Sequence, residues 1–158
     1  LRLSSAASDV YKRQPKKIHG TIFSKSTSGM KYGRHIDNAY MSSGRADLSF
    51  TVFLNCKKKY EGGALSIQGL NSEEKFKLDA GEIIIYPSTY LHSVEKVIDG
   101  ERLVFIGWIE SYVKSIEERE YLFDLDAAAR SLLAKYGRSE EVDLIYKSYS
   151  NFLRRLGN

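Results

Sequence analysis

The sequence predicts a mainly β fold, a sandwich or barrel in one domain, followed by two C-terminal helices. Three observations support this prediction. Short β-type runs separated by turn residues fill residues 18–110, helical periodicity replaces them afterwards, and 42% hydrophobic and 12% aromatic residues in a chain of 158 suffice for one substantial core. Many short strands without intervening helices favour an antiparallel sandwich or barrel over alternating strand–helix units.

Eight runs have the alternation expected of strands, and turn-forming Gly, Pro, Asn, Asp or Ser residues separate them. The expected strands are Ile18–Ser24, Tyr32–Ala39, Ala46–Asn55, Ala64–Gln68, Lys75–Leu78, Glu82–Tyr86, His92–Ile98 and Arg102–Ile109. The segment "VEKVIDGERLVFIGW" is the clearest hairpin, with Asp99-Gly100 as the expected turn pair.

Two amphipathic helices are expected after Ile109. Ser115 followed by Glu118 is a capping-box signature, and Gly137 is a typical helix stop. Apolar residues follow at helical spacing in each helix. They are Leu122, Leu125, Ala129 and Leu132 in the first, and Val142, Ile145, Tyr149, Phe152 and Leu156 in the second. We expect both stripes to pack on the outer face of the sheet.

The chain divides into three parts at this level. Residues 1–14, "LRLSSAASDVYKRQ", have no sustained period and resemble a translated sequencing adaptor, so we expect a non-native or disordered segment and a missing natural N-terminus. Residues 15–111 form the expected β core. Residues 112–158 form the helical pair expected to pack on the barrel.

Charge, cysteine content and hydropathy argue against a highly basic protein, a disulfide-bonded protein and a membrane protein. The net charge is +4, but it falls to +2 without residues 1–14, and the Lys57–Lys59 run is typical of solvated surface. Cys56 is the single cysteine, which excludes an intramolecular disulfide and favours a reducing cytoplasm. No apolar run is long enough for a spanning helix, so no membrane association is expected.

The segment "KYGRHIDNAY" places His35 and Asp37 two positions apart. Side chains with this spacing on a strand point to the same face, with Ile36 turned away. His92, which follows "YPSTYL", completes two imidazoles and one carboxylate, the ligand set of non-haem Fe(II) oxygenases. An HxD pair with one distant histidine is weak evidence alone, because such pairs often form only hydrogen bonds.

Arg102 is the second candidate site residue. It shares strand parity with Val104, Ile106 and Trp108, so an inward face would bury its charge. A buried guanidinium needs an anion, and its rigid fork suits a carboxylate. The alternative is an arginine on the barrel rim that pairs with Glu101 or Asp99.

Together these segments resemble a known family. "GMKYGRHIDNA", "RADLSFTVFLN", "YEGGAL", "AGEIIIYPSTYLHSVEKVIDGERLVFIGWIES" and "LFDLDAAAR" are similar, in order, to signature blocks of bacterial PKHD-type hydroxylases. These enzymes are Fe(II)- and 2-oxoglutarate-dependent dioxygenases related to prolyl 4-hydroxylase catalytic domains. The resemblance covers residues from about 18 to 158 and implies a double-stranded β-helix, or jelly-roll, barrel.

The resemblance also implies residue roles. His35, Asp37 and His92 correspond to the catalytic iron ligands, and Arg102 to the residue that holds the distal carboxylate of 2-oxoglutarate. The reaction uses O2, releases succinate and CO2, and hydroxylates a C–H bond of a peptide, amino acid or other small molecule. Ascorbate is the implied accessory reductant. Oligomeric state is not indicated.

Two departures from the family pattern stand out. Ser26 occupies the place of a tyrosine that usually supports the co-substrate, so we expect either that Tyr32 or a water substitutes or that co-substrate binding is weakened. The family also has an N-terminal helical portion that this chain lacks. Two other functions stay open: a nucleic-acid-directed oxygenase of the same superfamily, which the small basic excess does not favour, and an inactive, truncated metal-binding barrel.

Overall fold

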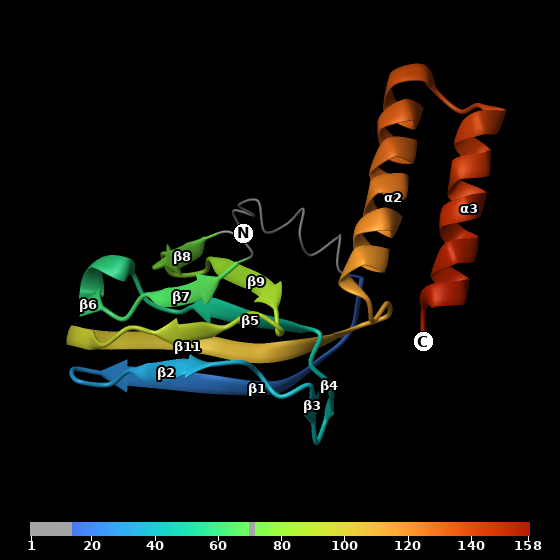
Figure 1. The fold of residues 1–158 in the computed structure, drawn as a ribbon. Helices are drawn as coiled ribbons and strands as arrows, with labels where there is room; N and C mark the ends of the chain where they lie inside the picture. The colour runs from blue at the N-terminus through green and yellow to red at the C-terminus, as the bar shows by residue number, and fades with distance from the viewer. Residues whose placement is uncertain (1–13, 70–71) are drawn as a thin grey trace. The chain divides into compact units, whose positions relative to one another are not determined.

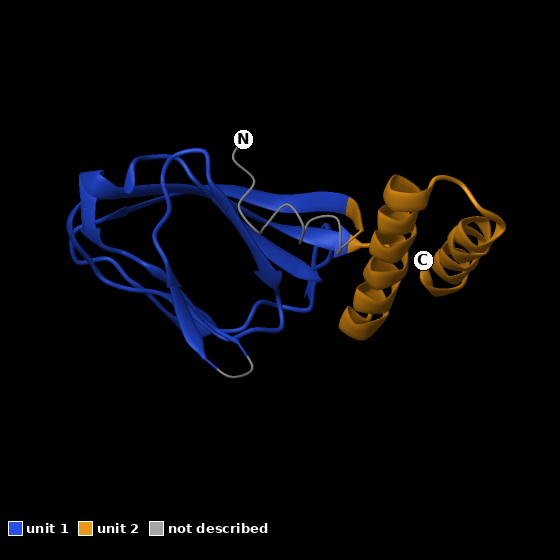
Figure 2. Ribbon diagram, turned by 90° about the horizontal axis from the view of Figure 1, so that it is seen from above, with its two compact units in different colours: residues 1–6, 17–110 blue, residues 7–16, 111–158 orange. Residues whose placement is uncertain are grey.

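The computed structural model of the chain describes residues 14–69 and 72–158. The prediction for residues 1–14 therefore lies outside the described part, apart from Gln14. The described residues divide into two compact units, shown in Figure 2: residues 17–110, and residues 14–16 with residues 111–158. The prediction of a mainly β chain with two C-terminal helices is confirmed.

The strands of the first unit assemble mainly into two antiparallel sheets (Figure 1). Their bounds are β1 Pro15–Thr27, β2 Tyr32–His35, β3 Tyr40–Met41, β4 Gly44–Arg45, β5 Leu48–Phe53, β6 Tyr60–Gly62, β7 Leu65–Gln68, β8 Glu73–Phe76, β9 Ile83–Pro87, β10 His92–Val94 and β11 Val97–Ser111. One sheet has the order β1-β11-β5-β9 with β6 paired to β11, the other has the order β2-β10-β7-β8, and β3 and β4 form a small ribbon.

The core of the barrel lies between these sheets. Leu65 and Ile67 of β7 form a buried cluster with Tyr86 of β9, although the two strands belong to different sheets. Leu48 and Phe53 of β5 are fully buried. Packing between two antiparallel sheets of mixed strand order is the jelly-roll arrangement, so the predicted double-stranded β-helix is confirmed.

The predicted hairpin at Asp99-Gly100 is wrong. β11 runs without a turn through both residues, because its first part pairs with β6, in which Tyr60 is the partner of Gly100. Gly100 has φ of 78°, and a Cβ there would lie 2.3 Å from the carbonyl oxygen of Lys59. The glycine thus allows close approach of β6 instead of a chain reversal.

The second unit contains two consecutive helices, α2 Ile116–Tyr136 and α3 Glu140–Leu156, which pack against each other. Ser115 accepts a hydrogen bond from the Glu118 backbone N–H, and Gly137 ends α2, as the sequence predicts. Ser139 caps α3 through the Val142 N–H. Packing of the pair on the barrel stays a prediction.

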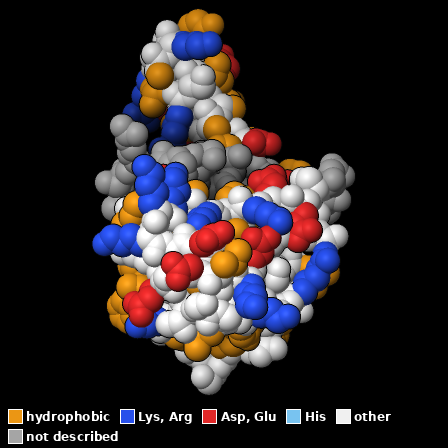
Figure 3. Space-filling model, turned by 90° about the vertical axis from the view of Figure 1, so that its left-hand side faces the viewer, with side chains coloured by type: hydrophobic (Ala, Val, Ile, Leu, Met, Phe, Trp, Pro, Cys, Tyr) orange, Lys and Arg blue, Asp and Glu red, His pale blue; other side chains and the backbone are white. Residues whose placement is uncertain are grey.

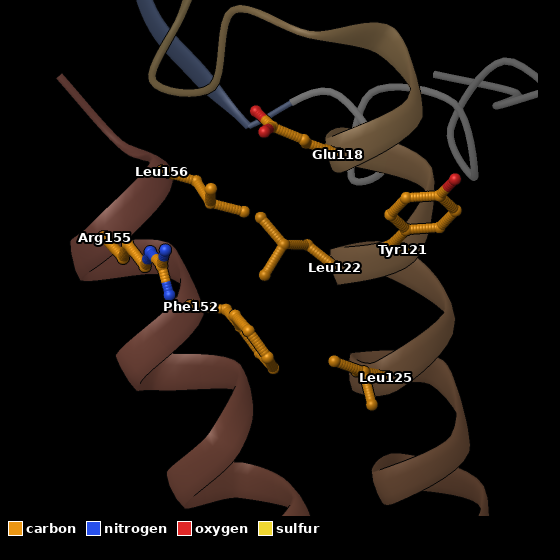
Figure 4. Close-up of a pocket in the computed structure, with 7 residues that line it drawn as sticks. All are labelled: Glu118, Tyr121, Leu122, Leu125, Phe152, Arg155 and Leu156. Atoms are coloured by element: carbon orange, nitrogen blue, oxygen red, sulfur yellow. The ribbon is translucent and has the colours of Figure 1, made fainter.

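The facing sides of α2 and α3 enclose a pocket of about 300 Å³. Figure 4 shows Leu122 and Leu125 of α2 pointing toward Phe152 and Leu156 of α3. The predicted apolar stripes of the two helices therefore contact each other. No helix among the described residues has the length and hydropathy needed to cross a membrane.

Candidate metal centre

Two strand ends and a segment that follows one of them bring the predicted ligands together. His35 is the last residue of β2, and His92 is the first of β10; the two are direct partners in the antiparallel pair of these strands. Asp37 follows β2 by two residues, so the strand expected to include it ends earlier than predicted. The candidate ligand atoms of His35, Asp37 and His92 nevertheless all lie within 4.8 Å of one another.

A hydrogen bond at Nδ1 of each ring fixes the orientation of the two imidazoles. His35 Nδ1 lies 2.8 Å from the Gly33 carbonyl oxygen, and His92 Nδ1 lies 3.0 Å from that of Tyr90. A carbonyl only accepts, so each Nδ1 donates, which leaves Nε2 as the ring atom of each histidine that can bind a metal. Both Nε2 atoms face Asp37, at 3.9 Å from Oδ1 for His35 and 3.8 Å from Oδ2 for His92. The three side chains thus turn their coordinating atoms toward one another and form a candidate site for one metal ion.

Asp37 is held by a chain of hydroxyl groups that the sequence did not reveal. Ser49 of β5 donates to Asp37 Oδ2, and its oxygen lies 2.8 Å from Ser88 Oγ. Ser49 uses its single proton on the carboxylate, so Ser88 is the donor in the second bond. Ser49 and Ser88 are each 3% exposed. Because both hydroxyl groups are buried, their hydrogen bonds hold the Asp37 carboxylate in one orientation.

The site is exposed on the side of His35 and buried on the side of His92. The side chain of His35 is 30% exposed, whereas that of His92 is 7% exposed. The two rings lie 4.2 Å apart between centroids, and the Tyr86 ring lies 5.1 Å from that of His92. Solvent therefore reaches the centre on the side of His35.

Arg102 lies inside the barrel, and the alternative of a rim position is wrong. Its residue exposure is 3%, its Cζ lies 5.7 Å from the centroid of the Phe53 ring, and Glu101 pairs with Lys25 at 2.5 Å. Arg102 Nε has no hydrogen-bond partner among the described residues. Burial lowers the pKa of the guanidinium, and the phenol groups of Tyr60 and Tyr86 oppose this shift.

Tyr86 connects the two parts of the site. Burial raises the pKa of its phenol, the Asp37 carboxylate raises it further, and the Arg102 charge acts in the opposite direction. Tyr86 is the cross-strand partner of Ser49, which in turn is the partner of Trp108, so these three side chains share the inner face of the sheet. The metal centre and Arg102 therefore open on one interior.

The remaining candidates have simpler positions. The Tyr32 ring packs edge-on against His35 at 4.5 Å, but the residue is 62% exposed, and its proposed contact with the co-substrate stays a prediction. His19 is buried on the edge strand β1. Its ring nitrogens bond Ser43 Oγ and the Arg45 carbonyl oxygen, which is a structural role.

A jelly-roll barrel that holds two histidines, an aspartate and a buried arginine is the arrangement of Fe(II)/2-oxoglutarate oxygenases. Residues 21–110 match the family model described as the 2OG-Fe(II) oxygenase superfamily, and the chain belongs to that superfamily. Residues 117–157 match the model of the PKHD-type hydroxylase C-terminal domain. Within the superfamily the chain is thus of the PKHD type, as the sequence predicts.

Individual relatives agree with this assignment. The chain is 78% identical to a PKHD-type hydroxylase of Prochlorococcus marinus strain MIT 9215 and 72% identical to one of strain AS9601. The first alignment covers 90% of this chain and the second 91%; each covers 65% of the relative, so the chain spans about two thirds of these curated proteins. A 2OG-Fe(II) oxygenase family oxidoreductase from Burkholderia pseudomallei shares the fold, with 18% identity and a TM-score of 0.52 over 60% of this chain and 44% of that one.

Proposed function

We propose that this chain is the catalytic part of an Fe(II)- and 2-oxoglutarate-dependent dioxygenase that hydroxylates a C–H bond. The substrate would be a peptide, an amino acid or another small molecule, and the co-products would be succinate and CO2. Superfamily membership supports the co-substrate, and the names of the PKHD-type relatives support hydroxylation. Ascorbate as accessory reductant and a cytoplasmic location belong to the same proposal.

One observation carries the proposal: an open His–Asp–His centre shares one barrel interior with a buried guanidinium whose Nε has no hydrogen-bond partner among the described residues. Two imidazoles and one carboxylate leave several coordination positions of an octahedral metal for other ligands. A guanidinium without a protein anion offers a place for one carboxylate of a dicarboxylic acid. 2-Oxoglutarate has both a metal-chelating 2-oxo acid end and a distal carboxylate, so it fits the two features together.

Each site residue has a task in this scheme. His35, Asp37 and His92 would hold Fe(II), which when bound supplies redox chemistry toward O2. Ser49 keeps the Asp37 carboxylate turned toward the two Nε2 atoms. Arg102 orients the co-substrate by binding its distal carboxylate, and the apolar core between the sheets keeps that end free of bulk water.

A nucleic-acid substrate is the second candidate, and the surface charge does not favour it. On the face in Figure 3, Lys and Arg side chains are interspersed with Asp and Glu side chains. Several exposed lysines are paired, among them Lys57 with Asp79 at 3.1 Å and Lys75 with Glu95 at 2.5 Å. A strand-binding groove needs a continuous basic surface with aromatic side chains.

An inactive barrel is the third candidate. A barrel that had lost its function would have no need to keep Arg102 buried without an anion, because such a charge is costly in a protein interior. The hydroxyl chain behind Asp37 is also a feature that a metal site uses. Both features support a functional centre.

The test is anaerobic binding of Fe(II) and 2-oxoglutarate, followed by succinate release when O2 is added. The wild-type chain should bind both and release succinate, and His35→Ala should do neither. Arg34→Ala is the matched control, because this neighbour on β2 is exposed and outside the ligand set. A folded wild-type chain that binds neither compound would disprove the proposal.

A further inference from the structure

Tyr60 is a buried tyrosine whose hydroxyl lacks a partner. It lies on β6, is 5% exposed, and its hydroxyl has no hydrogen-bond partner among the described residues. A phenol of this kind usually has a partner when it is buried, because losing water without replacing its hydrogen bonds is unfavourable. The hydroxyl therefore indicates a place for a polar ligand atom.

Arg102 and Tyr60 are neighbours on the same wall of the barrel. Tyr60 is the cross-strand partner of Gly100, two residues before Arg102 on β11. A Cβ built on Gly63 would lie 3.3 Å from Tyr60 Cε2 and 3.2 Å from Arg102 Cδ. Both side chains thus pack over one glycine, and each has an unpaired polar atom, the Tyr60 hydroxyl and Arg102 Nε.

Lys77 fixes the position of Tyr60. Its ammonium group donates to the Tyr60 carbonyl oxygen at 2.7 Å and lies 4.4 Å from the centroid of the ring. The backbone and the ring of Tyr60 are therefore held by the same residue. Burial raises the pKa of the Tyr60 phenol, with Arg102 opposing the shift, so the hydroxyl keeps its proton at neutral pH and can donate.

We propose that the Tyr60 hydroxyl donates a hydrogen bond to the same ligand carboxylate that Arg102 binds. The inference rests on the proposed function, in which that carboxylate is the distal one of 2-oxoglutarate. A carboxylate has about four lone-pair sites on two oxygens, so a guanidinium and a phenol can bind it together. Tyr60 would then be a second protein donor to the carboxylate, beside Arg102.

The test compares Tyr60→Phe with the wild-type chain in anaerobic calorimetric titrations of the Fe(II)-loaded protein. Phenylalanine keeps the ring that packs over Gly63 and removes only the donor. We expect 2-oxoglutarate to bind about tenfold more weakly, as for loss of one hydrogen bond to a charged group. Tyr136→Phe, which alters a tyrosine that is 79% exposed on α2, should bind as the wild type does.

A second ligand separates this role from a general effect on the fold. 2-Oxopentanoate has the same 2-oxo acid end as 2-oxoglutarate but a methyl group in place of the distal carboxylate. Wild type and Tyr60→Phe should bind it equally. A loss of affinity for both ligands in Tyr60→Phe would overturn the inference, since the residue would then act on the metal centre or the fold.

The two proposals fail differently. If the wild-type chain binds Fe(II) and 2-oxoglutarate, and Arg102→Lys binds 2-oxoglutarate weakly, the proposed function stands. Tyr60→Phe with wild-type affinity for 2-oxoglutarate would then disprove the role of Tyr60 alone. A wild-type chain that binds no 2-oxoglutarate would disprove the proposed function and, with it, this inference.

Discussion

At the scale of single residues, a conservative substitution can test whether the planar guanidinium of Arg102 binds the co-substrate. Lysine keeps the charge but has no planar pair of donors, so it cannot bind a carboxylate in the same way. We expect Arg102→Lys to weaken 2-oxoglutarate binding roughly 10- to 100-fold, since a charge-assisted hydrogen bond contributes about 1.5–3 kcal/mol. Anaerobic calorimetric titration measures this change.

The control for this substitution is Arg138→Lys. The Arg138 side chain is 79% exposed and pairs with Asp143 in the second unit. Arg138→Lys should therefore leave the affinity for 2-oxoglutarate unchanged. Equal affinities in Arg102→Lys and wild type would show that the guanidinium does not bind the co-substrate.

Ser49 offers a test of how the metal ligand is oriented. Ser49→Ala removes the donor to Asp37 and leaves Ser88 without its acceptor. We expect roughly 10- to 100-fold weaker binding of Mn(II), used as a redox-stable substitute for Fe(II), as is typical when a residue behind a metal ligand is removed. Equilibrium titration with Mn(II) gives the affinity, and Ser72→Ala, at an exposed position, should match the wild type. An unaltered Mn(II) affinity in Ser49→Ala would argue that Asp37 is oriented by other contacts.

The sequence indicates some of these residues and not others for a physical reason. His35, Asp37, His92 and Arg102 carry chemistry that stands out in a β-rich sequence, and strand parity relates Arg102 to its apolar neighbours. Ser49 and Tyr60 look like ordinary strand residues. Their positions in the site depend on the pairing of β5 with β9 and β11 and of β6 with β11. Their positions depend on register between strands far apart in sequence, which local patterns do not give.

At the scale of elements, substitutions of Gly100 and Gly81 separate two contributions to stability, the cost of a left-handed backbone conformation and the cost of a steric clash. Both have positive φ, 78° and 87°, but a Cβ at Gly81 would meet nothing within 4 Å, whereas one at Gly100 would lie 2.3 Å from Lys59 O. Gly81→Ala should cost roughly 1–2 kcal/mol of unfolding free energy, from the left-handed conformation alone. Gly100→Ala should cost a further 1–3 kcal/mol, because β6 must move away from β11.

Urea unfolding of the two variants measures these costs. Equal losses would mean that the β6–β11 contact yields without penalty, contrary to the close approach in the structure. This contact is also where the sequence misleads, because Asp-Gly between two apolar runs is a strong hairpin signal. The pair fails to turn because Val97, Asp99 and Gly100 of β11 have strand partners on β6.

The helix caps predict a pH dependence of the second unit. The pKa values of Glu117 and Glu141 lie below the ordinary value of 4.5, first because of hydrogen bonds with Ser115 and Ser139 and then because of backbone hydrogen bonds. A lowered folded-state pKa means stabilisation that is present above pH 4.5 and is lost as the pH falls through the lower folded value. Helical circular dichroism should therefore weaken on acidification below pH 4.5, and the double variant Glu117→Gln/Glu141→Gln should show a smaller change. The same acid profile in both proteins would exclude the caps as its cause.

At the scale of the whole chain, the two units differ in how their structure arises from sequence. The helical unit is defined by local signals, namely caps at Ser115 and Ser139 and the stop at Gly137, so its bounds follow closely from the sequence. The barrel depends on pairing between distant strands, so its class is predictable while β3, β4 and β6 are not. A metal centre built from β2, β10 and Asp37, two residues after β2, therefore exists only when the barrel is assembled.

This dependence predicts that ligands of the centre stabilise the barrel. A ligand that binds the folded state alone at 100 times its Kd adds about 2.7 kcal/mol to the free energy of unfolding. The single tryptophan, Trp108, lies on β11 beside Ser49 and reports on the barrel unit by fluorescence. Mn(II) with 2-oxoglutarate should therefore raise the urea midpoint of the Trp108 signal, and Mn(II) alone should raise it less. His35→Ala should show no rise with either, because the site lacks one of its three ligands; a wild-type midpoint that ignores both compounds would contradict the coupling of site and barrel.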